Sequence, residues 1–158
     1  MKKLLIVLAI VALSGMWLLG CASGKNLKDF SDAIGTELRL LEVHIDGTFG
    51  REIIFDRRTL TREGDGKIFT IKFDGQIVSG TGAPNLYSAP YTLGDDQSIS
   101  IMPMRSTLMA SLFEPEKLPE HQFFGYMQNA NKWQFVDGNL ELLSRTEDGR
   151  EVRLVFGR

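Results

Sequence analysis

The fold is decided by residues 69–80, Phe-Thr-Ile-Lys-Phe-Asp-Gly-Gln-Ile-Val-Ser-Gly. Every second residue of the first half is apolar, a period of two that places Phe69, Ile71 and Phe73 on one face of a strand. The Asp-Gly pair that follows tolerates the positive φ angles of a two-residue turn, so a second strand is expected over residues 76–80. This stretch predicts a β-hairpin with one apolar face.

The same turn signal recurs along the chain and predicts a meander of antiparallel strands. It occurs at four further places: Asp46-Gly47, Asp65-Gly66, Asp137-Gly138 and Asp148-Gly149. Apolar alternation flanks the last two, over Trp133 to Leu142 and over Val152 to Phe156. Near the start, the apolar residues change parity after Leu40, which predicts a β-bulge there and suits the bent strands of a barrel.

Only one segment of the mature chain has clear helical spacing, from about Pro119 to Asn129. Its apolar stripe consists of Phe123, Phe124, Met127 and Ala130. With the strands, this segment predicts an α+β domain, a curled antiparallel meander or half-open β-barrel packed on one amphipathic helix.

Composition limits the chain to one modest globular domain. It has 158 residues, of which 43% are hydrophobic and 24% charged, with a net charge of −2. Nucleic acid is an unexpected partner, because binding phosphates needs a concentrated basic face. Here the basic residues Arg51, Arg57, Arg58 and Arg62 alternate with acidic ones.

The first 20 residues have the order of a secretory signal: Lys2 and Lys3, an apolar stretch, then a small residue. Leu-Leu-Gly-Cys at residues 18–21 resembles the bacterial lipobox, in which the cysteine is lipidated and the leader is removed. We therefore expect a lipoprotein signal peptide over residues 1–20, lipid attachment at Cys21, a polar tether over 21–34 that is disordered over 22–28, and a domain over 35–158. An uncleaved signal anchor or a buried free thiol is the alternative.

Catalytic and metal-binding patterns are weak. The only cysteine is Cys21, and the two histidines, His44 and His121, lack metal-ligand spacing and are expected to be exposed. No catalytic residue, metal or cofactor is therefore predicted. A hydrolase that uses a carboxylate pair, or one of the serines Ser79, Ser106 and Ser111, is the enzymatic alternative.

Two segments carry a resemblance to a known family. Residues 78–87, Val-Ser-Gly-Thr-Gly-Ala-Pro-Asn-Leu-Tyr, and residues 107–110, Thr-Leu-Met-Ala, resemble the META domain of HslJ-like bacterial lipoproteins, in family order from Gly35 to Phe156. The signature residues are Gly80, Asn85, Tyr87, Thr107, Met109 and Ala110, for which we expect structural roles, with Met109 in the core. The family commonly has cysteine at the positions of Pro84 and Ser111, so no disulfide or redox role is carried over.

The resemblance implies a non-enzymatic protein of the cell envelope linked to stress response and antibiotic tolerance. The expected partners are the membrane, through the N-terminal lipid, and an envelope protein or a hydrophobic peptide or acyl chain bound between sheet and helix. Ala22, rather than aspartate, after the lipidated cysteine favours the outer membrane, facing the periplasm or the surface. A passive surface lipoprotein that interacts with a host is the alternative function.

Overall fold

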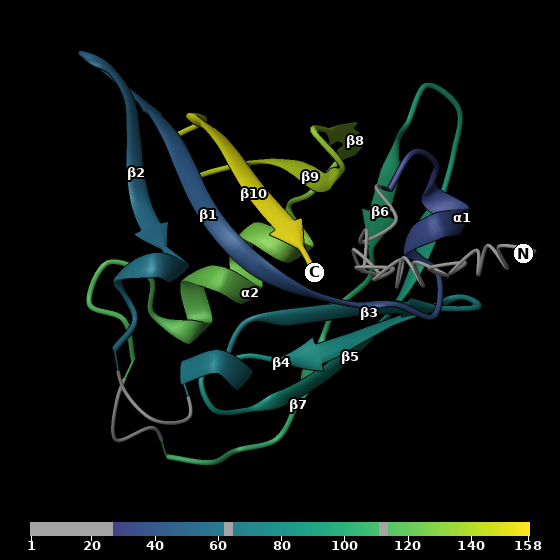
Figure 1. Ribbon diagram of the computed structural model, residues 1–158, viewed down its shortest axis with the longest axis horizontal. Coiled ribbons are helices and arrows are strands. Elements are labelled where there is room, and N and C mark those ends of the chain that lie inside the picture. Colours follow the sequence, from purple (N-terminus) through teal and green to yellow (C-terminus); the bar gives the residue numbers. More distant parts are fainter. Residues whose placement is uncertain (1–26, 62–64, 111–113) are drawn as a thin grey trace, which may run out of the picture.

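The computed structural model describes residues 27–61, 65–110 and 114–158. These ranges hold two α-helices and ten strands (Figure 1). In chain order they are α1 (Phe30–Ala33), β1 (Glu37–Gly47), β2 (Gly50–Asp56), β3 (Thr70–Asp74), β4 (Ile77–Thr81), β5 (Leu86–Leu93), β6 (Ile99–Ile101), β7 (Arg105–Ser106), α2 (Glu120–Gln128), β8 (Lys132–Val136), β9 (Asn139–Arg145) and β10 (Glu151–Gly157).

The strands form an antiparallel sheet that curls into a nearly closed barrel. Its order is β6-β5-β4-β3-β1-β10-β9-β8, while β2 and β7 lie off this path, paired with β1 and β5. The two ends of the sheet meet at a thin seam. There the Trp133 N–H donates to the Gln97 carbonyl over 2.9 Å, and the Ile99 N–H donates to the Asn131 carbonyl over 3.1 Å. The predicted curled antiparallel sheet is confirmed, but the barrel is nearly closed rather than half-open, and α1 is a second helix beside the single one predicted.

Not all of the five Asp-Gly pairs form the turns predicted for them. The pairs at 74–75 and 137–138 lie at the turns that join β3 to β4 and β8 to β9, and Asp148-Gly149 lies in the β9–β10 connection. The first hairpin turns two residues later than predicted, at Thr48-Phe49, and Asp65-Gly66 begins a 3-10 helix over Asp65–Lys67 instead of a hairpin. A permissive dipeptide marks where the chain can turn, but strand pairing selects the register.

β1 divides its pairing between two strands on the same side. Residues 37–39 pair with β3 and residues 42–47 pair with β2, and the register against β10 shifts between Leu40 and Glu42, which confirms the predicted bulge. The fork between β3 and β2 exposes carbonyl groups that no strand can satisfy. Arg57 fills this fork, because its guanidinium donates to the carbonyls of Leu40 (2.5 Å) and Ile68 (2.6 Å).

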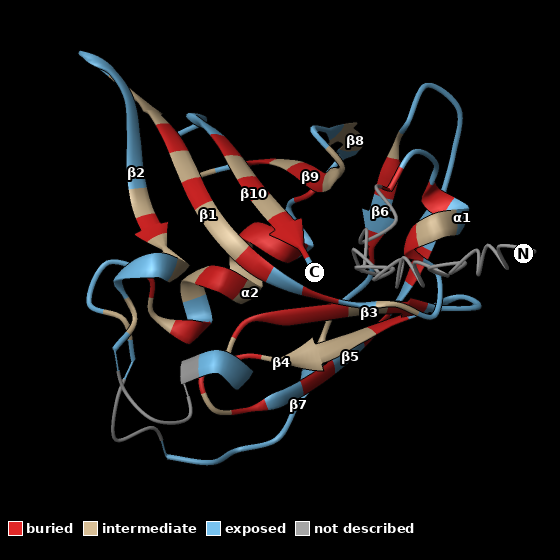
Figure 2. Ribbon diagram, viewed as in Figure 1, coloured by how far each residue is buried: buried red, intermediate tan, exposed pale blue. Residues whose placement is uncertain are grey.

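Alternate residues of the central strands point into one hydrophobic core, as the red bands along β1 and β10 show (Figure 2). Phe69, Ile71 and Phe73 are fully buried, as are Leu142 on β9 and Leu154 on β10. Ring contacts extend across the core, with centroid distances of 4.8 Å for Phe69–Phe123 and 5.0 Å for Phe73–Tyr91 and Phe30–Trp133.

Helix α2 begins after Pro119 and ends before Asn129, as the spacing predicts. Phe123, Tyr126 and Met127 are buried, whereas Phe124 is half-buried. In Figure 1 the helix lies behind β1 and β10.

The segment expected to be a polar tether is folded at its C-terminal end. Leu27, Phe30 and Ala33 are buried in the core, and α1 starts with a capping box between Asp29 and Asp32. The expectation of disorder is therefore wrong at Leu27, while residues 21–26 lie outside the described residues. The three-residue spacing of Leu27, Phe30 and Ala33 is the signal that could have shown this helix.

Candidate functional site

The structure brings the family-signature residues of β4, β5 and the segment after β7 into one hydrogen-bond network. Gly80 lies on β4, Tyr87 on β5 and Asn85 immediately before β5, while Thr107, Met109 and Ala110 follow β7. Cys21, the predicted lipid-attachment residue, lies outside the described residues.

A carboxylate that the sequence did not single out, that of Glu120, is the centre of this network. Its Oε1 accepts the backbone N–H groups of Ala83 (2.5 Å) and Asn85 (2.7 Å), and its Oε2 accepts the Asn85 side-chain amide (2.6 Å). Glu120 is buried at the start of α2, and its own N–H donates to Glu114. A Cβ on Gly82 would lie 2.4 Å from Glu120 Oε1, which explains the glycine there.

Asn85 links this carboxylate to the segment after β7. Its Oδ1 accepts the Thr107 hydroxyl (2.8 Å) and the Met109 N–H (2.7 Å), and the Thr107 hydroxyl oxygen accepts the Leu86 N–H (3.1 Å). Both the oxygen and the nitrogen of the Asn85 side-chain amide are thus hydrogen-bonded inside the protein. The asparagine therefore joins three segments that are distant in sequence.

Tyr87 and Gly80 fix the contact between β5 and β3. The buried Tyr87 hydroxyl donates to the Thr70 carbonyl over 2.8 Å, and burial raises the pKa of this phenol far above its ordinary value. A Cβ at Gly80 would lie 2.1 Å from the same carbonyl oxygen. Only glycine allows the two backbones to approach this closely.

Within the described residues, the side chains of Asn85, Tyr87 and Thr107 are hydrogen-bonded to other parts of the domain. Met109 and Ala110 are exposed, so the expected core role of Met109 is wrong. What the segment after β7 contributes is the Met109 backbone, bound by Asn85.

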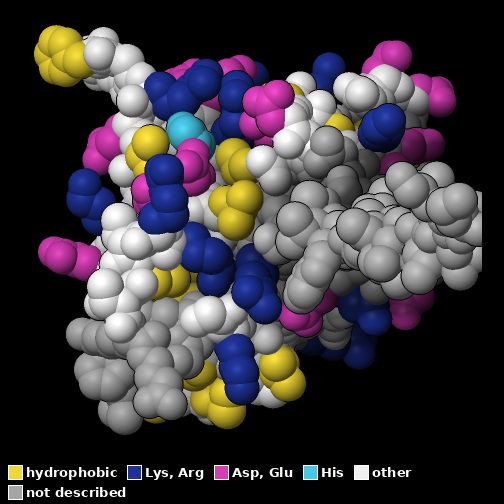
Figure 3. All heavy atoms as spheres, in the orientation of Figure 1, with side chains coloured by type: hydrophobic (Ala, Val, Ile, Leu, Met, Phe, Trp, Pro, Cys, Tyr) yellow, Lys and Arg dark blue, Asp and Glu magenta, His cyan; other side chains and the backbone are white. Residues whose placement is uncertain are grey.

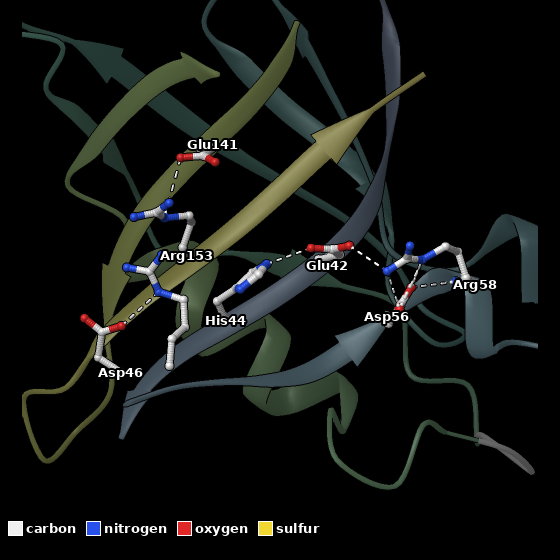
Figure 4. Close-up of polar contacts among 8 residues, drawn as sticks. Glu42, His44, Asp46, Asp56, Arg58, Glu141 and Arg153 are labelled. Carbon is white, nitrogen blue, oxygen red and sulfur yellow. Dashed lines mark hydrogen bonds and ion pairs between the residues drawn. The ribbon is translucent and has the colours of Figure 1, made fainter. Parts of the chain in front are cut away.

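The outer face of β2, β1, β10, β9 and β8 carries charged residues that point toward one another (Figure 4). His44 Nε2 lies 2.8 Å from Glu42 Oε2, and the other oxygen of Glu42 lies 3.1 Å from the Arg58 guanidinium. Hydrogen bonds from Arg58 lower the pKa of Asp56. His44 points outward, as predicted, but it is half-buried rather than exposed, because Glu42 holds its ring against the sheet.

On the same face, Glu141 is buried between β8 and β10. Its Oε2 accepts the Gln134 amide over 2.6 Å and lies 3.5 Å from Arg153 Nε. This Nε is buried and makes no hydrogen bond within the described residues. The Arg153 guanidinium therefore pairs with Glu141 through its Nε atom, so its positive charge is only partly neutralised.

A groove of about 500 Å³ opens beside these residues. Its lining has four basic side chains, those of Arg51, Lys132, Arg145 and Arg153, and two acidic ones, those of Asp46 and Glu151. Arg51 pairs with Asp46 through Nε over 3.1 Å. In the part of the chain that the structure describes, the side chains of Lys132 and Arg145 have no hydrogen bond or ion pair. The groove therefore offers free cationic donors on a chain of net negative charge.

A second hollow, of about 470 Å³, lies between α2 and the β9–β10 connection and shares Arg145 with the groove. Tyr126 lines it, and burial raises the pKa of this tyrosine. Asp148 also lines it, and its pKa is lowered by a hydrogen bond from the Thr146 hydroxyl and by Arg150. Its acidic and basic residues are balanced, so it lacks the free charge of the groove.

The space between sheet and helix, where we expected a hydrophobic partner, is occupied by side chains. Phe69, Phe73 and Phe123 are fully buried and contact other rings.

The residues of the predicted enzymatic alternative lie on different strands. Ser79 is on β4 and Ser106 on β7, whereas His44 is on β1 and engaged by Glu42. His121 is exposed on the first turn of α2, and Ser111 lies outside the described residues. Over residues 27–61, 65–110 and 114–158, no group of three metal-binding side chains comes together.

Within those same ranges, none of the helices combines the length and the apolar character that crossing a bilayer requires.

The chain matches a protein family in sequence and solved structures in fold. Residues 53–156 match the META domain, and no curated protein matches the chain. An NMR structure of a protein from Burkholderia xenovorans aligns over 80% of this chain and 85% of that chain, with a TM-score of 0.53 and 14% identity. A crystal structure of a DUF4847 family protein from Bacteroides vulgatus aligns over 79% and 94%, with a TM-score of 0.50 and 10% identity. At these identities the likeness concerns the fold alone.

Proposed function

The chain belongs to the META domain family, and from that membership we propose that it is a non-enzymatic binding protein of the bacterial cell envelope. In this proposal acyl chains at Cys21 hold it on the outer membrane, and its role is in stress tolerance. The curled sheet packed on α2 is a rigid frame, and the outer-face groove is the binding surface.

The observation that carries the proposal is the free charge of the groove. Lys132 and Arg145 approach it from β8 and β9 without an ionic partner among the described residues, and Arg51 and Arg153 present guanidinium groups that are paired through Nε alone. Side chains that serve only the fold satisfy one another, as Glu120 and Asn85 do. Unpaired cations around a hollow instead suit an anionic partner.

Lipid anchoring is tested by the intact mass of the protein purified from its native membrane. We expect a chain that starts at Cys21 and carries added acyl mass, because two or more chains are needed for stable attachment. The Cys21→Ser variant is the control and should retain its leader. An unmodified thiol, or a retained leader in the wild-type protein, would contradict the anchor.

Binding at the groove is tested on the full chain in detergent, titrated with a hexaglutamate peptide. We expect salt-sensitive binding that is lost in the double variant Lys132→Glu, Arg145→Glu. The matched control is Arg105→Glu, which reverses an exposed charge on β7, away from the groove. Equal binding by the double variant and the control would exclude the groove as the binding surface.

A further inference from the structure

The hairpin of β1 and β2 extends from the barrel and ends in an aromatic residue. Phe49 at its turn is fully exposed, and Ile53 on β2 is about half exposed. The space-filling view shows a hydrophobic side chain at the protruding tip of this hairpin (Figure 3). A large apolar side chain held in water at such a position indicates a contact surface.

The tip adjoins the cationic groove. Arg51 lines the groove and is two residues from Phe49, and Asp46 and His44 line it from the other strand of the hairpin. Figure 3 shows dark blue Lys and Arg side chains gathered on the face next to the tip. An exposed aromatic residue thus adjoins a groove in which Lys132 and Arg145 have no ionic partner among the described residues.

From this juxtaposition we propose that the hairpin face docks on an anionic lipid surface. Phe49 enters the interfacial region of the bilayer, and the cations of the groove bind lipid phosphate groups. Exposed apolar rings such as that of Phe insert at the boundary between headgroups and acyl chains, and basic side chains are attracted to anionic headgroups over about a Debye length. The proposal rests on the membrane attachment proposed above and names the bound partner.

Two positions along the molecule then contact the bilayer. Helix α1, which follows the predicted lipid-attachment segment, and the Phe49 tip lie toward opposite ends of the long axis in Figure 1. A protein that is anchored near one end and docked at the other lies along the membrane instead of extending from it. The acyl chains supply affinity, and the hairpin face supplies orientation.

The test uses protein purified from its native membrane, reconstituted into vesicles, with a tryptophan at the tip. Phe49→Trp is compared with Leu108→Trp, because Leu108 is also an almost fully exposed apolar residue but follows β7, away from the hairpin. Trp133 is common to both proteins and cancels in the comparison, whereas Trp17 belongs to the leader that is removed before Cys21. The probe is a vesicle of phosphatidylcholine and phosphatidylglycerol with brominated acyl chains, which quench tryptophan on contact.

We expect at least twofold stronger quenching for Phe49→Trp than for Leu108→Trp in anionic vesicles. This quenching should fall to the Leu108→Trp level in pure phosphatidylcholine, and also when Lys132→Glu and Arg145→Glu are added. Arg105→Glu should leave it unchanged, and circular dichroism should verify that each variant is folded. Equal quenching of the two tryptophans, or quenching at the tip that does not depend on anionic lipid, overturns the proposal.

Flotation of the same samples separates this proposal from the anchor. Protein that floats with vesicles but shows no quenching at the tip contradicts docking and leaves the anchor intact. Lipid-dependent quenching in a protein whose mass shows an unmodified Cys21 contradicts the anchor and supports docking.

Discussion

At Glu120, one carboxylate accepts three hydrogen bonds from the segment that precedes β5. Glutamine has the same shape but only one acceptor oxygen, so its amide would face either two backbone donors or the Asn85 amide. Asn85 cannot turn over to compensate, because its oxygen is held by Thr107 and Met109. The substitution therefore places a buried N–H donor of the new amide against another N–H donor, with no acceptor between them.

We predict that Glu120→Gln lowers the free energy of unfolding by about 2 kcal/mol, the range of a hydrogen bond to a charged group. Urea denaturation followed by tryptophan fluorescence would measure the loss. The control is Glu116→Gln, an exposed position four residues earlier, which should change stability by less than about 0.5 kcal/mol. A similar effect of both variants would count against the role of the network.

Tyr87 makes stability depend on alkaline pH. Burial raises its folded-state pKa above the ordinary value of about 10, so above that pH the unfolded chain loses a proton that the folded protein retains. The contribution of Tyr87 to the free energy of unfolding is fully present below pH 10. Above pH 10 this contribution decreases by about 1.4 kcal/mol per pH unit.

We expect Tyr87→Phe to be less stable at pH 8, because it loses the hydrogen bond to Thr70, but to have a shallower decrease between pH 10 and 11.5. Tyr91 and Tyr126, whose pKa values burial also raises, account for part of the remaining slope. Denaturation at several pH values would measure it. Parallel pH profiles for the variant and the wild-type protein would show that Tyr87 does not contribute.

The sequence patterns identified the signature residues but did not identify Glu120, the residue that binds Asn85. Gly80, Asn85 and Tyr87 stand in a recognisable segment, whereas Glu120 precedes an apolar helical stripe and resembles any acidic first-turn residue. Its role depends on the chain returning to Asn85 over a sequence separation of 35 residues. Long-range pairing of this kind leaves no local signal.

At the level of elements, Arg57 compensates for the divided pairing of β1. A single planar group reaches the Leu40 carbonyl on β1 and the Ile68 carbonyl just before β3, a geometry that the point charge of lysine cannot reproduce. We predict that Arg57→Lys lowers the free energy of unfolding by about 1–3 kcal/mol. Arg58→Lys, at an exposed ion pair beside it, should cost less than about 1 kcal/mol.

Urea denaturation would compare these two variants, and hydrogen exchange would locate the change. The Leu40 N–H, which donates to Phe69 across the fork, should exchange faster in Arg57→Lys only. Equal free energies of unfolding for the two variants would show that Arg57 does not stabilise the divided pairing of β1.

Hairpins were predictable where apolar alternation and turn chemistry agreed. Asp137-Gly138 is an example, because both residues adopt positive φ between β8 and β9. At Asp46-Gly47 the strand continues through the pair, since Gly47 still faces Gly50 in the ladder. Local preference permits a turn at either place, and pairing with the neighbouring strand decides between them.

At the level of the whole molecule, the barrel closes through a seam much weaker than its other strand pairs. β8 and β6 are joined by the isolated Ser98–Lys132 bridge and the two backbone hydrogen bonds at Trp133 and Ile99, whereas β1 and β10 pair over six positions. Local opening follows the places with fewest bonds. The sequence predicted the curl but not its closure, because no motif marks where β6 and β8 meet.

We predict that the amides of Trp133 and Ile99 exchange with solvent at least about tenfold faster than those of Val43 and Leu154 in the centre of the sheet. Native-state hydrogen exchange by NMR would measure all four in one experiment. Equal protection would mean that the seam opens only when the whole domain unfolds.

The way in which β2 is attached has a consequence for how such a domain can diversify. In the sheet the strand pairs with β1 and with no strand beyond it among the described residues, and residues 46–51 take no part in the pairing of β1 with β10. Insertions, deletions or a grafted recognition loop at this position would leave the barrel intact. The hairpin is therefore a point at which relatives can acquire new surfaces without rebuilding the fold.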